Sequence, residues 1–315
     1  MTTTATTKRT WTILELIDWS REYLAEKGFE HPRLETELLL GHAISLPRIE
    51  LYLQYERRLK EPELAAFKTL LKRRLAGEPV QYVTGTAGFM LADFEVTSDV
   101  LIPRPETEAL VEVAARLIAE WFDADRTSAQ AADAAGDTTG DGTPILVDIG
   151  TGSGVIAVTL AQKFPAAKVI ATDVSPEALA VAAGNAERIG VSDRVTFVEG
   201  TGLAPLHELG LAGRVDGLIS NPPYICSSDM DGLPTEVRDF EPRLALDGGG
   251  DGLDCLRSII EDVPDVLADG GVMALEFGDG QADAVRDLTA SALADVSIHR
   301  DYAGRDRIVT GRKTG

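Results

Sequence analysis

From Pro144 onward the chain alternates short apolar runs with longer segments of helical character, and this alternation strongly limits its possible folds. Five runs follow one another, separated by more than a dozen residues: ILVDIG, KVIATD, RVTFVEG, VDGLISN and VMALEFG. Such spacing predicts parallel strands joined by right-handed crossovers. Two later runs, ADVSIHRDY and DRIVTGR, lie too close together for a crossover and predict an antiparallel pair at the sheet edge. We therefore expect a doubly wound α/β domain whose ligand lies at the carboxyl ends of the strands.

The first 85 residues predict a separate helical bundle. Thr12 and Glu15 have the spacing of a capping box at the start of a helix. Pro32 and Pro62 each suit the first turn of a further helix. Short connections predict antiparallel packing of four or five helices, and no chemical motif is visible in them.

Residues 86–105 predict a β-hairpin that links this bundle to the second domain, residues 106–315. Short apolar runs stand on either side of Ala92 and Asp93, which the pattern places at the turn.

Residues 123–143 predict a mobile surface loop within the second domain. This stretch is rich in Ala, Asp, Gly and Thr and poor in apolar bulk. It cannot bury enough surface to offset the entropy of ordering. We expect deletion of Asp125 to Gly142 to leave the chemistry of the domain intact.

The composition limits the classes of molecule that the chain is expected to bind. The chain carries 51 acidic and 30 basic residues, a formal net charge of −21, and its basic residues are scattered. This balance disfavours nucleic acid and anionic lipid and favours a protein or small-molecule substrate. No apolar run approaches the roughly 18 residues of a membrane span, and no secretory signal is visible, so a cytoplasmic location is expected. Cys226 and Cys255 have no partners at metal-ligand spacing, so we expect neither a disulfide framework nor a metal site.

A glycine-rich turn, DIGTGSG, follows the first of the parallel strands. Gly150, Gly152 and Gly154 allow the backbone to bend sharply and approach a ligand. Their spacing differs from the Gly-x-Gly-x-x-Gly of dinucleotide-binding folds. Asp173 ends the next strand and is placed to accept hydrogen bonds from ribose hydroxyls. The alternative is that the glycines only form a strand-to-helix turn and that Asp173 only caps a helix.

The stretch SNPPYI follows a later strand. Its combination with the glycine turn and Asp173 resembles the class I S-adenosylmethionine-dependent methyltransferases, and this resemblance implies a site for a planar amide or amine. Such a nitrogen is a poor nucleophile because its lone pair is delocalised. The side-chain oxygen of Asn221 and the backbone carbonyl of Pro222 can hold its two N–H bonds and leave the lone pair available. Pro222 and Pro223 have fixed φ and no N–H, and Tyr224 can stack on the planar group. The alternative is a rigid turn, which the accompanying glycine turn and Asp173 disfavour.

The same resemblance implies a Rossmann-like, mostly parallel seven-stranded sheet and S-adenosyl-L-methionine as cofactor. The activated methyl group then needs alignment with its acceptor, and no metal is required.

Seven motifs, spread from about Trp11 to Arg312, narrow the resemblance to the release-factor glutamine methyltransferase family, also called PrmC or HemK. In chain order the motifs are GEPVQYVTG, VLIPRPETEALVE, DIGTGSGVIAVTLA, ISNPPYI, EPRLALDGGGDGLD, LEFG and DYAGRDRIV. In that family a helical amino-terminal domain and a hairpin linker precede a domain that methylates the glutamine side-chain amide nitrogen in the Gly-Gly-Gln motif of class 1 peptide-chain release factors.

The resemblance assigns site residues. It implies release-factor recognition by residues 1–85, a ribose contact by Asp173, and a position near the cofactor for Asn221. The implied cofactor loop is Gly150, Thr151, Gly152, Ser153 and Gly154. The implied glutamine site is Asn221, Pro222, Pro223 and Tyr224.

Further segments have a family likeness but an open role. The segment Ile102–Glu108 favours a release-factor substrate, or else only shapes the start of a helix. Glu241 and Pro242 are candidates for the pocket wall. Where the family commonly has an acidic residue that meets the adenine, this chain has Gly200 and Thr201, and Glu199 is a possible substitute one position earlier.

Other functions remain open at this point. A nucleic-acid amino methyltransferase shares the Asn-Pro-Pro-Tyr motif but is disfavoured by the acidic composition. A ribosomal-protein glutamine methyltransferase resembles the chain only partly over Ile102–Glu108. A scaffold that binds cofactor without catalysis is disfavoured by the complete motif. We expect a monomer.

Overall fold

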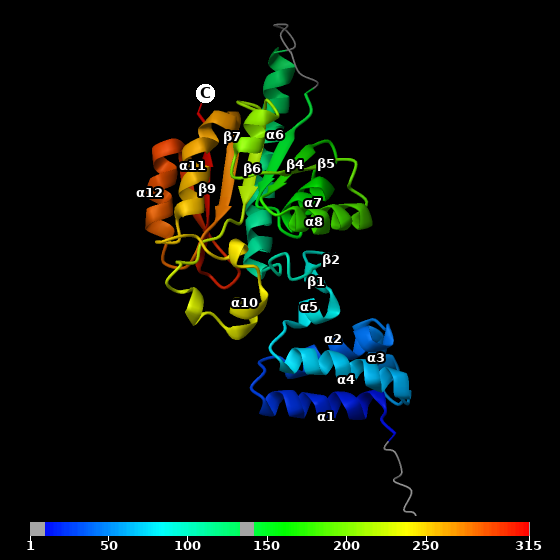
Figure 1. The fold of residues 1–315 in the computed structure, drawn as a ribbon. Coiled ribbons are helices and arrows are strands. Elements are labelled where there is room, and N and C mark those ends of the chain that lie inside the picture. The colour runs from blue at the N-terminus through cyan, green and yellow to red at the C-terminus, as the bar shows by residue number, and fades with distance from the viewer. Residues whose placement is uncertain (1–9, 133–141, 315) are drawn as a thin grey trace, which may run out of the picture. The chain divides into compact units, whose positions relative to one another are not determined.

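The computed structural model describes residues 10–132 and 142–314, and the chain divides into two compact units, residues 1–85 and 86–315 (Figure 1). Apolar side chains of the first unit form one core cluster, and those of the second unit form two others.

The first unit consists of helices in its described part: α1 (Ile13–Glu26), α2 (Pro32–Ile44), α3 (Arg48–Leu53), α4 (Glu61–Leu75) and α5 (Val80–Thr84). The predicted capping box is confirmed, because the Glu15 amide donates to Thr12 Oγ1 at 3.2 Å and the Thr12 amide donates to Glu15 Oε2 at 2.9 Å. Pro32 and Pro62 each lie within the first two positions of their helices, as predicted.

The second unit is built on the predicted α/β sheet. Its strands are β3 (Ile145–Ile149), β4 (Lys168–Asp173), β5 (Val195–Glu199), β6 (Val215–Ser220), β7 (Leu267–Glu276), β8 (Ala294–Arg300) and β9 (Asp306–Arg312). Their order is β5-β4-β3-β6-β7-β9-β8. The first five strands are parallel, and β9 is antiparallel to both of its neighbours. All seven strands were predicted, including the antiparallel pair at the edge.

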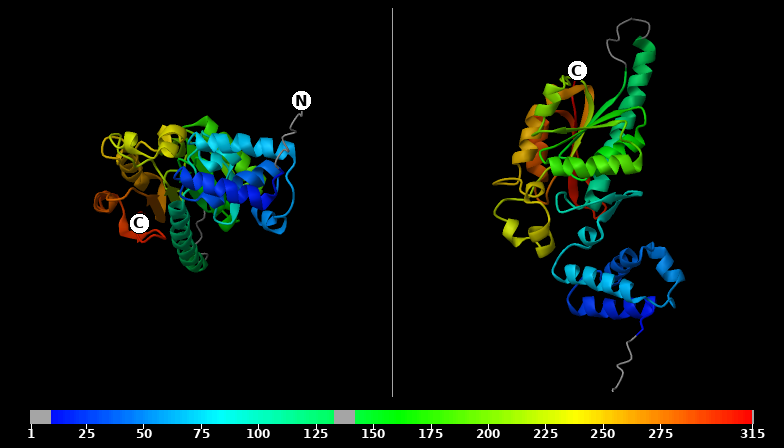
Figure 2. Two further views of the ribbon diagram at one scale, coloured as in Figure 1. Left: turned by 90° about the horizontal axis from the view of Figure 1, so that it is seen from below. Right: turned by 45° about the vertical axis from the view of Figure 1, so that its right-hand side comes forward.

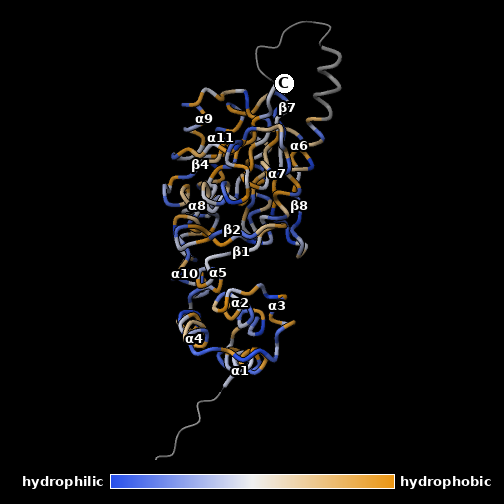
Figure 3. Tube along the Cα trace, turned by 90° about the vertical axis from the view of Figure 1, so that its right-hand side faces the viewer, coloured by the Kyte–Doolittle hydropathy of each residue, from blue (hydrophilic) through white to orange (hydrophobic). Residues whose placement is uncertain are grey.

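Helices cover both faces of this sheet (Figure 2). One face packs against α6 (Pro105–Ala132), α7 (Val155–Lys163) and α8 (Pro176–Ile189), and the other against α9 (Ala204–Glu208), α11 (Asp254–Val266) and α12 (Ala282–Ala292). Successive strand residues point to opposite faces, so Leu146 belongs to the first core and Val147 to the second. Strands buried on both sides explain the nearly continuous apolar runs in the sequence, which Figure 3 shows in orange.

The hairpin exists, but its turn was misplaced in the sequence. Strands β1 (Thr86–Phe89) and β2 (Ala92–Glu95) pair with Phe89 opposite Ala92. The turn is therefore at residues 90 and 91, and not at Ala92 and Asp93. In the observed register Ala87, Phe89 and Phe94 face the core of the second unit, and Leu91 is left fully exposed in the turn. The sequence interpretation counted Leu91 as part of the first strand because it is apolar.

The hairpin belongs to the second unit. The Glu95 amide donates to Asn185 Oδ1 at 2.8 Å, and Asn185 Nδ2 donates to the Glu95 carbonyl at 3.0 Å. Arg188 also donates to the Asp93 carbonyl, at 2.8 Å. These contacts join the hairpin to α8, so it is a packed part of the α/β domain as well as the segment that follows the helical bundle.

Helix α6 is longer than the sequence pattern indicated. It continues to Ala132, so residues 123–132 are helical where a loop was expected. Residues 133–141 of the same stretch lie outside the described residues. The expectation weighed only the lack of apolar bulk, whereas Ala, Arg and Gln in this stretch have high helix propensity and extend a helix already begun.

Candidate active site

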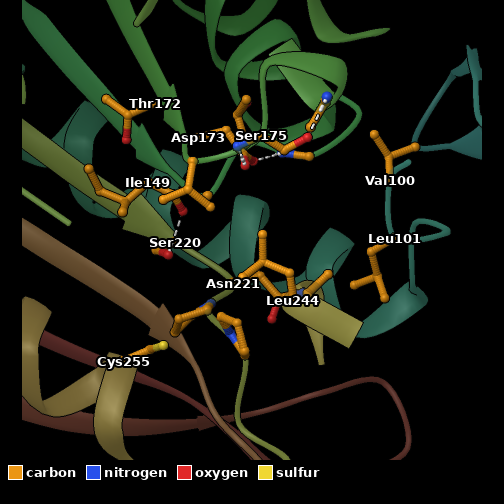
Figure 4. A pocket seen from close by; sticks show the side chains of 18 of the residues that line it. Val100, Leu101, Ile149, Thr172, Asp173, Ser175, Ser220, Asn221, Leu244 and Cys255 are labelled. Atoms are coloured by element: carbon orange, nitrogen blue, oxygen red, sulfur yellow. Dashed lines mark hydrogen bonds between the residues drawn. The ribbon is translucent and has the colours of Figure 1, made fainter. Parts of the chain in front are cut away.

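A cavity of about 560 Å³ opens at the carboxyl ends of β3, β4 and β6, where the topology predicted a ligand. Figure 4 shows side chains that reach it from these strand ends, with Val100 and Leu101 on the segment before α6. Most of the predicted site residues line it: Gly150, Thr151, Gly152, Ser153, Asp173, Asn221, Pro222 and Pro223. Gly154 and Tyr224 are predicted site residues that do not line it.

The glycine turn has the backbone shape that its sequence requires. Gly150, Gly152 and Gly154 have φ values of 70°, 54° and 83°, a region that favours glycine. A Cβ added to Gly150 or Gly152 would meet no atom within 4 Å. A Cβ added to Gly154 would lie 2.9 Å from the Ala182 Cβ, so this glycine allows α8 to pack closely against the turn.

The Asp173 carboxylate fixes the turn beside the cavity. Its Oδ2 accepts a hydrogen bond from the Gly152 amide at 2.8 Å, and its Oδ1 accepts one from the Ser175 amide at 3.0 Å. The N-cap of α8 is Ser175, whose Oγ accepts from the Ala178 amide at 3.1 Å. Asp173 therefore does more than cap a helix, because it joins two loops that line the same cavity.

Asp148, which the sequence analysis did not single out, holds the glycine turn and the start of α7 by hydrogen bonds. Its Oδ2 accepts hydrogen bonds from Thr151 Oγ1 at 2.6 Å and from the Ala157 amide at 3.1 Å. Among the described residues, its Oδ1 has no hydrogen-bond partner. Burial raises the pKa of the Asp148 carboxyl to about 7. The available sequence signal was an acidic residue inside the apolar run ILVDIG.

Asn221 lies where β6 ends, and its amide is held by residues distant in the chain. Asn221 Nδ2 donates to Thr107 Oγ1 at 3.1 Å, and the Thr107 hydroxyl donates to Glu276 Oε2 at 2.8 Å. The Tyr224 hydroxyl donates to the other oxygen of Glu276 at 3.4 Å. One buried carboxylate thus connects both ends of the Asn-Pro-Pro-Tyr motif.

The environment of Glu276 changes its acidity. Burial raises the pKa of its carboxyl to about 7, and the charge of Glu106 adds to the rise. The hydrogen bond from Thr107 and the charge of Arg307 oppose it. Burial and the charge of Glu276 in turn raise the pKa of the Tyr224 hydroxyl above its ordinary value, so Tyr224 stays a hydrogen-bond donor.

The two segments whose role the sequence left undecided, Ile102–Glu108 and Glu241 with Pro242, meet at the cavity. Arg104, which immediately precedes α6, forms an ion pair with the buried Glu241 at 2.5 Å. The Ile102 amide donates to the same carboxylate at 3.4 Å. Pro103, Arg104, Thr107 and Pro242 all line the cavity. Glu241 therefore supports the wall through Arg104.

Glu199 was suggested from the sequence as a substitute for the acidic residue that meets the adenine, but it lies outside the cavity. That residue is exposed and does not line the cavity, whereas Gly200 and Thr201 do. A Cβ at position 200 would lie 2.4 Å from the Pro205 Cγ, which explains the glycine. Asp254, Cys255 and Ser258 from α11 also line the cavity.

The described residues, 10–132 and 142–314, hold no group of three or more His, Cys, Asp or Glu side chains that could bind a metal ion. None of their helices has the length and apolar character needed to cross a membrane.

Comparison with known proteins gives consistent matches along the chain. The family model described as "PrmC N-terminal domain" matches residues 15–85, and the model described as "Methyltransferase small domain" matches residues 139–233. A protein of Geobacter sulfurreducens named "Release factor glutamine methyltransferase" is 44% identical over 303 residues, which cover 96% of this chain and 97% of the relative. Proteins of the same name from Chlorobaculum tepidum and Bacillus subtilis are 42% and 38% identical, each over 95% of this chain and over 97% and 96% of the relative.

Among solved structures, the fold is similar to that of the hMettl16 catalytic domain, solved in complex with a MAT2A 3'UTR hairpin. The TM-score is 0.50 at 17% identity, and the match covers 82% of this chain and 84% of that one. At this identity the likeness concerns the methyltransferase fold alone.

Proposed function

This chain belongs to the release factor glutamine methyltransferase family, and from that premise we propose its reaction. It transfers a methyl group from S-adenosyl-L-methionine to the side-chain amide nitrogen, N5, of the glutamine in the Gly-Gly-Gln motif of class 1 release factors. The observation that carries the proposal is the Asn221 amide, whose nitrogen is held by Thr107 beside the cavity.

The residues around the cavity fit the proposed cofactor. The backbone at Gly150 and Gly152 leaves open space where side chains would stand, and the Asp173 carboxylate can accept hydrogen bonds from ribose hydroxyls. In the proposed site the loop Gly150–Gly154, Asp173 and Asn221 hold the cofactor, with Gly154 acting through its packing on α8. The bound cofactor supplies a methyl group already activated by a positively charged sulfur.

The proposed task of the Asn-Pro-Pro-Tyr motif is to hold the substrate amide. The Asn221 side-chain oxygen and the Pro222 backbone carbonyl accept its two N–H bonds, so the lone pair on the nitrogen faces the methyl group. Pro223 stiffens this turn, and Tyr224 supports the planar group. Alignment of this kind is worth up to about 7–11 kcal/mol of a reaction barrier in favourable cases.

The wider proposal concerns partners and organisation. Residues 1–85 recognise the release factor, and the enzyme works as a cytoplasmic monomer. The formal charge of −21 supports a protein substrate over nucleic acid.

One assay tests the proposal. The purified enzyme is incubated with labelled cofactor and, separately, with release factor, its Gln-to-Ala variant at the Gly-Gly-Gln motif, ribosomal protein, DNA and ribosomal RNA. Label on the wild-type release factor alone is the expected result. Label on a nucleic acid, on a ribosomal protein or on the Gln-to-Ala variant contradicts the proposed substrate, and no label on any of them contradicts catalysis.

A further inference from the structure

The hydrogen bonds around Asn221 have a defined direction. The Thr107 hydroxyl has one proton, and an ionised carboxylate can only accept. Thr107 therefore gives its proton to Glu276 Oε2, 2.8 Å away, and can only accept from Asn221. The NH₂ group of Asn221 must then face Thr107, at 3.1 Å. The side-chain oxygen of Asn221 is then the branch of the amide that does not face Thr107.

We infer that Thr107 and Glu276 are positioning residues that hold the Asn221 amide in the one orientation in which its oxygen can accept from the substrate. This inference rests on the proposed function, because the orientation matters only if Asn221 holds the glutamine amide. Neither residue touches the reacting atoms in this scheme, and both act through Asn221.

Glu276 joins the two ends of the motif. Its Oε1 accepts from the Tyr224 hydroxyl at 3.4 Å while its Oε2 accepts from Thr107. It thereby ties α6, the end of β7 and the loop after β6 to one carboxylate. The other charged groups that act on Glu276 and Tyr224 are Arg104 just before α6, Glu106 in its first turn and Arg307 on β9.

Stability does not explain why a carboxylate stands at position 276. Its side chain is buried, and among the described residues no Lys, Arg or His forms an ion pair with it. The nearby Arg307 instead lies 3.8 Å from Asp301. Burial of a carboxylate without a cation costs stability. An apolar residue of similar size would avoid this cost, so we attribute the acid here to the orientation of Asn221.

The test compares three threonine variants with the wild type, all assayed on release factor with saturating cofactor. Thr107→Val keeps the shape but removes the hydroxyl, so the Asn221 amide can turn over. Thr107→Ser keeps the hydroxyl. Thr289→Val is the matched control, because Thr289 is also a buried helical threonine, but its hydroxyl donates to the Val285 carbonyl at 2.8 Å.

We expect Thr107→Val to lower kcat by about tenfold to a hundredfold, the range seen when an orienting partner is removed. The cofactor Kd and the KM for release factor should change by less than about threefold, since both binding surfaces remain. Thr107→Ser should recover most of the lost kcat. Thr289→Val should lower the Tm but leave kcat unchanged.

The outcomes separate this inference from the proposed function. If the wild type does not label release factor, the proposed function fails. If the wild type does, but Thr107→Val has the same kcat, the inference is overturned. Should Thr107→Val not fold, Glu276→Gln decides: its NH₂ group can donate to Thr107 and allows the reversed chain, so kcat should fall about tenfold. An unchanged kcat in that variant also overturns the inference.

Discussion

Asn221 is the side chain on which the proposed chemistry depends. In Asn221→Ala one of the two acceptors for the substrate N–H bonds is lost, while the glycine turn and Asp173 remain. We expect kcat to fall by at least about a hundredfold and cofactor affinity to change much less. Single-turnover kinetics and titration calorimetry with the cofactor measure the two effects. A variant with wild-type turnover would show that the oxygen acts elsewhere.

Glu276 gives the enzyme an expected pH dependence. Burial raises the pKa of its carboxyl from an ordinary value of 4.5 to about 7. Below pH 7 the protonated acid can donate to Thr107, which can then donate to the Asn221 oxygen and turn the amide over. We expect kcat to fall as the pH drops from about 8 to about 6. The acidic limb should be absent in Glu276→Gln, and a limb that persists there would assign it to another group.

The raised pKa of Glu276 affects folding stability in the opposite sense to its effect on kcat. Between its unfolded pKa of 4.5 and its folded pKa of about 7, Glu276 binds more proton in the folded state than in the unfolded state. Its contribution to stability is therefore full below about pH 4.5 and is lost as the pH rises through 7. Thermal melts should show the Tm of the wild type decreasing relative to that of Glu276→Gln over this range.

At the scale of elements, the contact between the glycine turn and α8 allows a matched comparison. Gly154 and Gly190 have nearly the same φ, 83° and 82°. An alanine at either position costs about 1–2 kcal/mol for the backbone alone. At Gly154 the added Cβ also lies 2.9 Å from Ala182, whereas at Gly190 it meets nothing within 4 Å.

We therefore expect Gly154→Ala to be destabilised by about 1–3 kcal/mol more than Gly190→Ala, the typical cost of overpacking. Because the clash moves the turn, cofactor affinity should fall in Gly154→Ala alone. Urea unfolding and calorimetry test both points. Equal cofactor affinity in the two variants would show that the turn tolerates displacement.

The stretch of residues 125–142, which begins in the last part of α6, is expected to be dispensable for methyl transfer. The described residues that line the cavity all lie outside this stretch, and β3 begins beyond it, at Ile145. Replacement of these residues by a short Gly-Ser linker should leave kcat and cofactor affinity within about threefold of the wild type, with a lower Tm from the shortened α6. A loss of turnover without a loss of folding would mean that the stretch reaches the substrate.

The sequence predicted the sheet well because each strand has a local signal. KVIATD, for example, is both the predicted run and the observed strand β4. The predicted hairpin turn was wrong because Leu91, although apolar, lies exposed in the turn and not in a strand. The predicted end of α6 was wrong because the prediction considered only apolar burial and left helix propensity out.

The candidate site was predictable only in part. The turn Gly150–Gly154, Asp173 and Asn221 stand in motifs that can be read locally. Thr107 and Glu276 are 169 positions apart, so no local pattern could join them. An acid at the end of the apolar run VMALEFG was the available signal for Glu276, as Asp148 was for the glycine turn.

At the scale of the whole molecule, the two units have separate cores and separate expected tasks. The residues that line the cavity lie between Ser98 and Ile259, all within the second unit. Removal of residues 1–85 should therefore leave cofactor affinity unchanged while raising the KM for release factor by about tenfold or more, equivalent to at least about 1.4 kcal/mol of binding. Calorimetry with cofactor and kinetics with release factor distinguish the two effects, and an unchanged KM would contradict recognition by the helical unit.

The strand order also has a consequence for synthesis. Among the described strands β8 pairs with β9 alone, and β9 also fills the edge of β7. As the nascent chain emerges from the ribosome, β8 appears before β9 and has no strand to pair with. A chain stalled between these strands would expose the edge of β7 together with an unpaired β8, a combination that invites aggregation and chaperone binding.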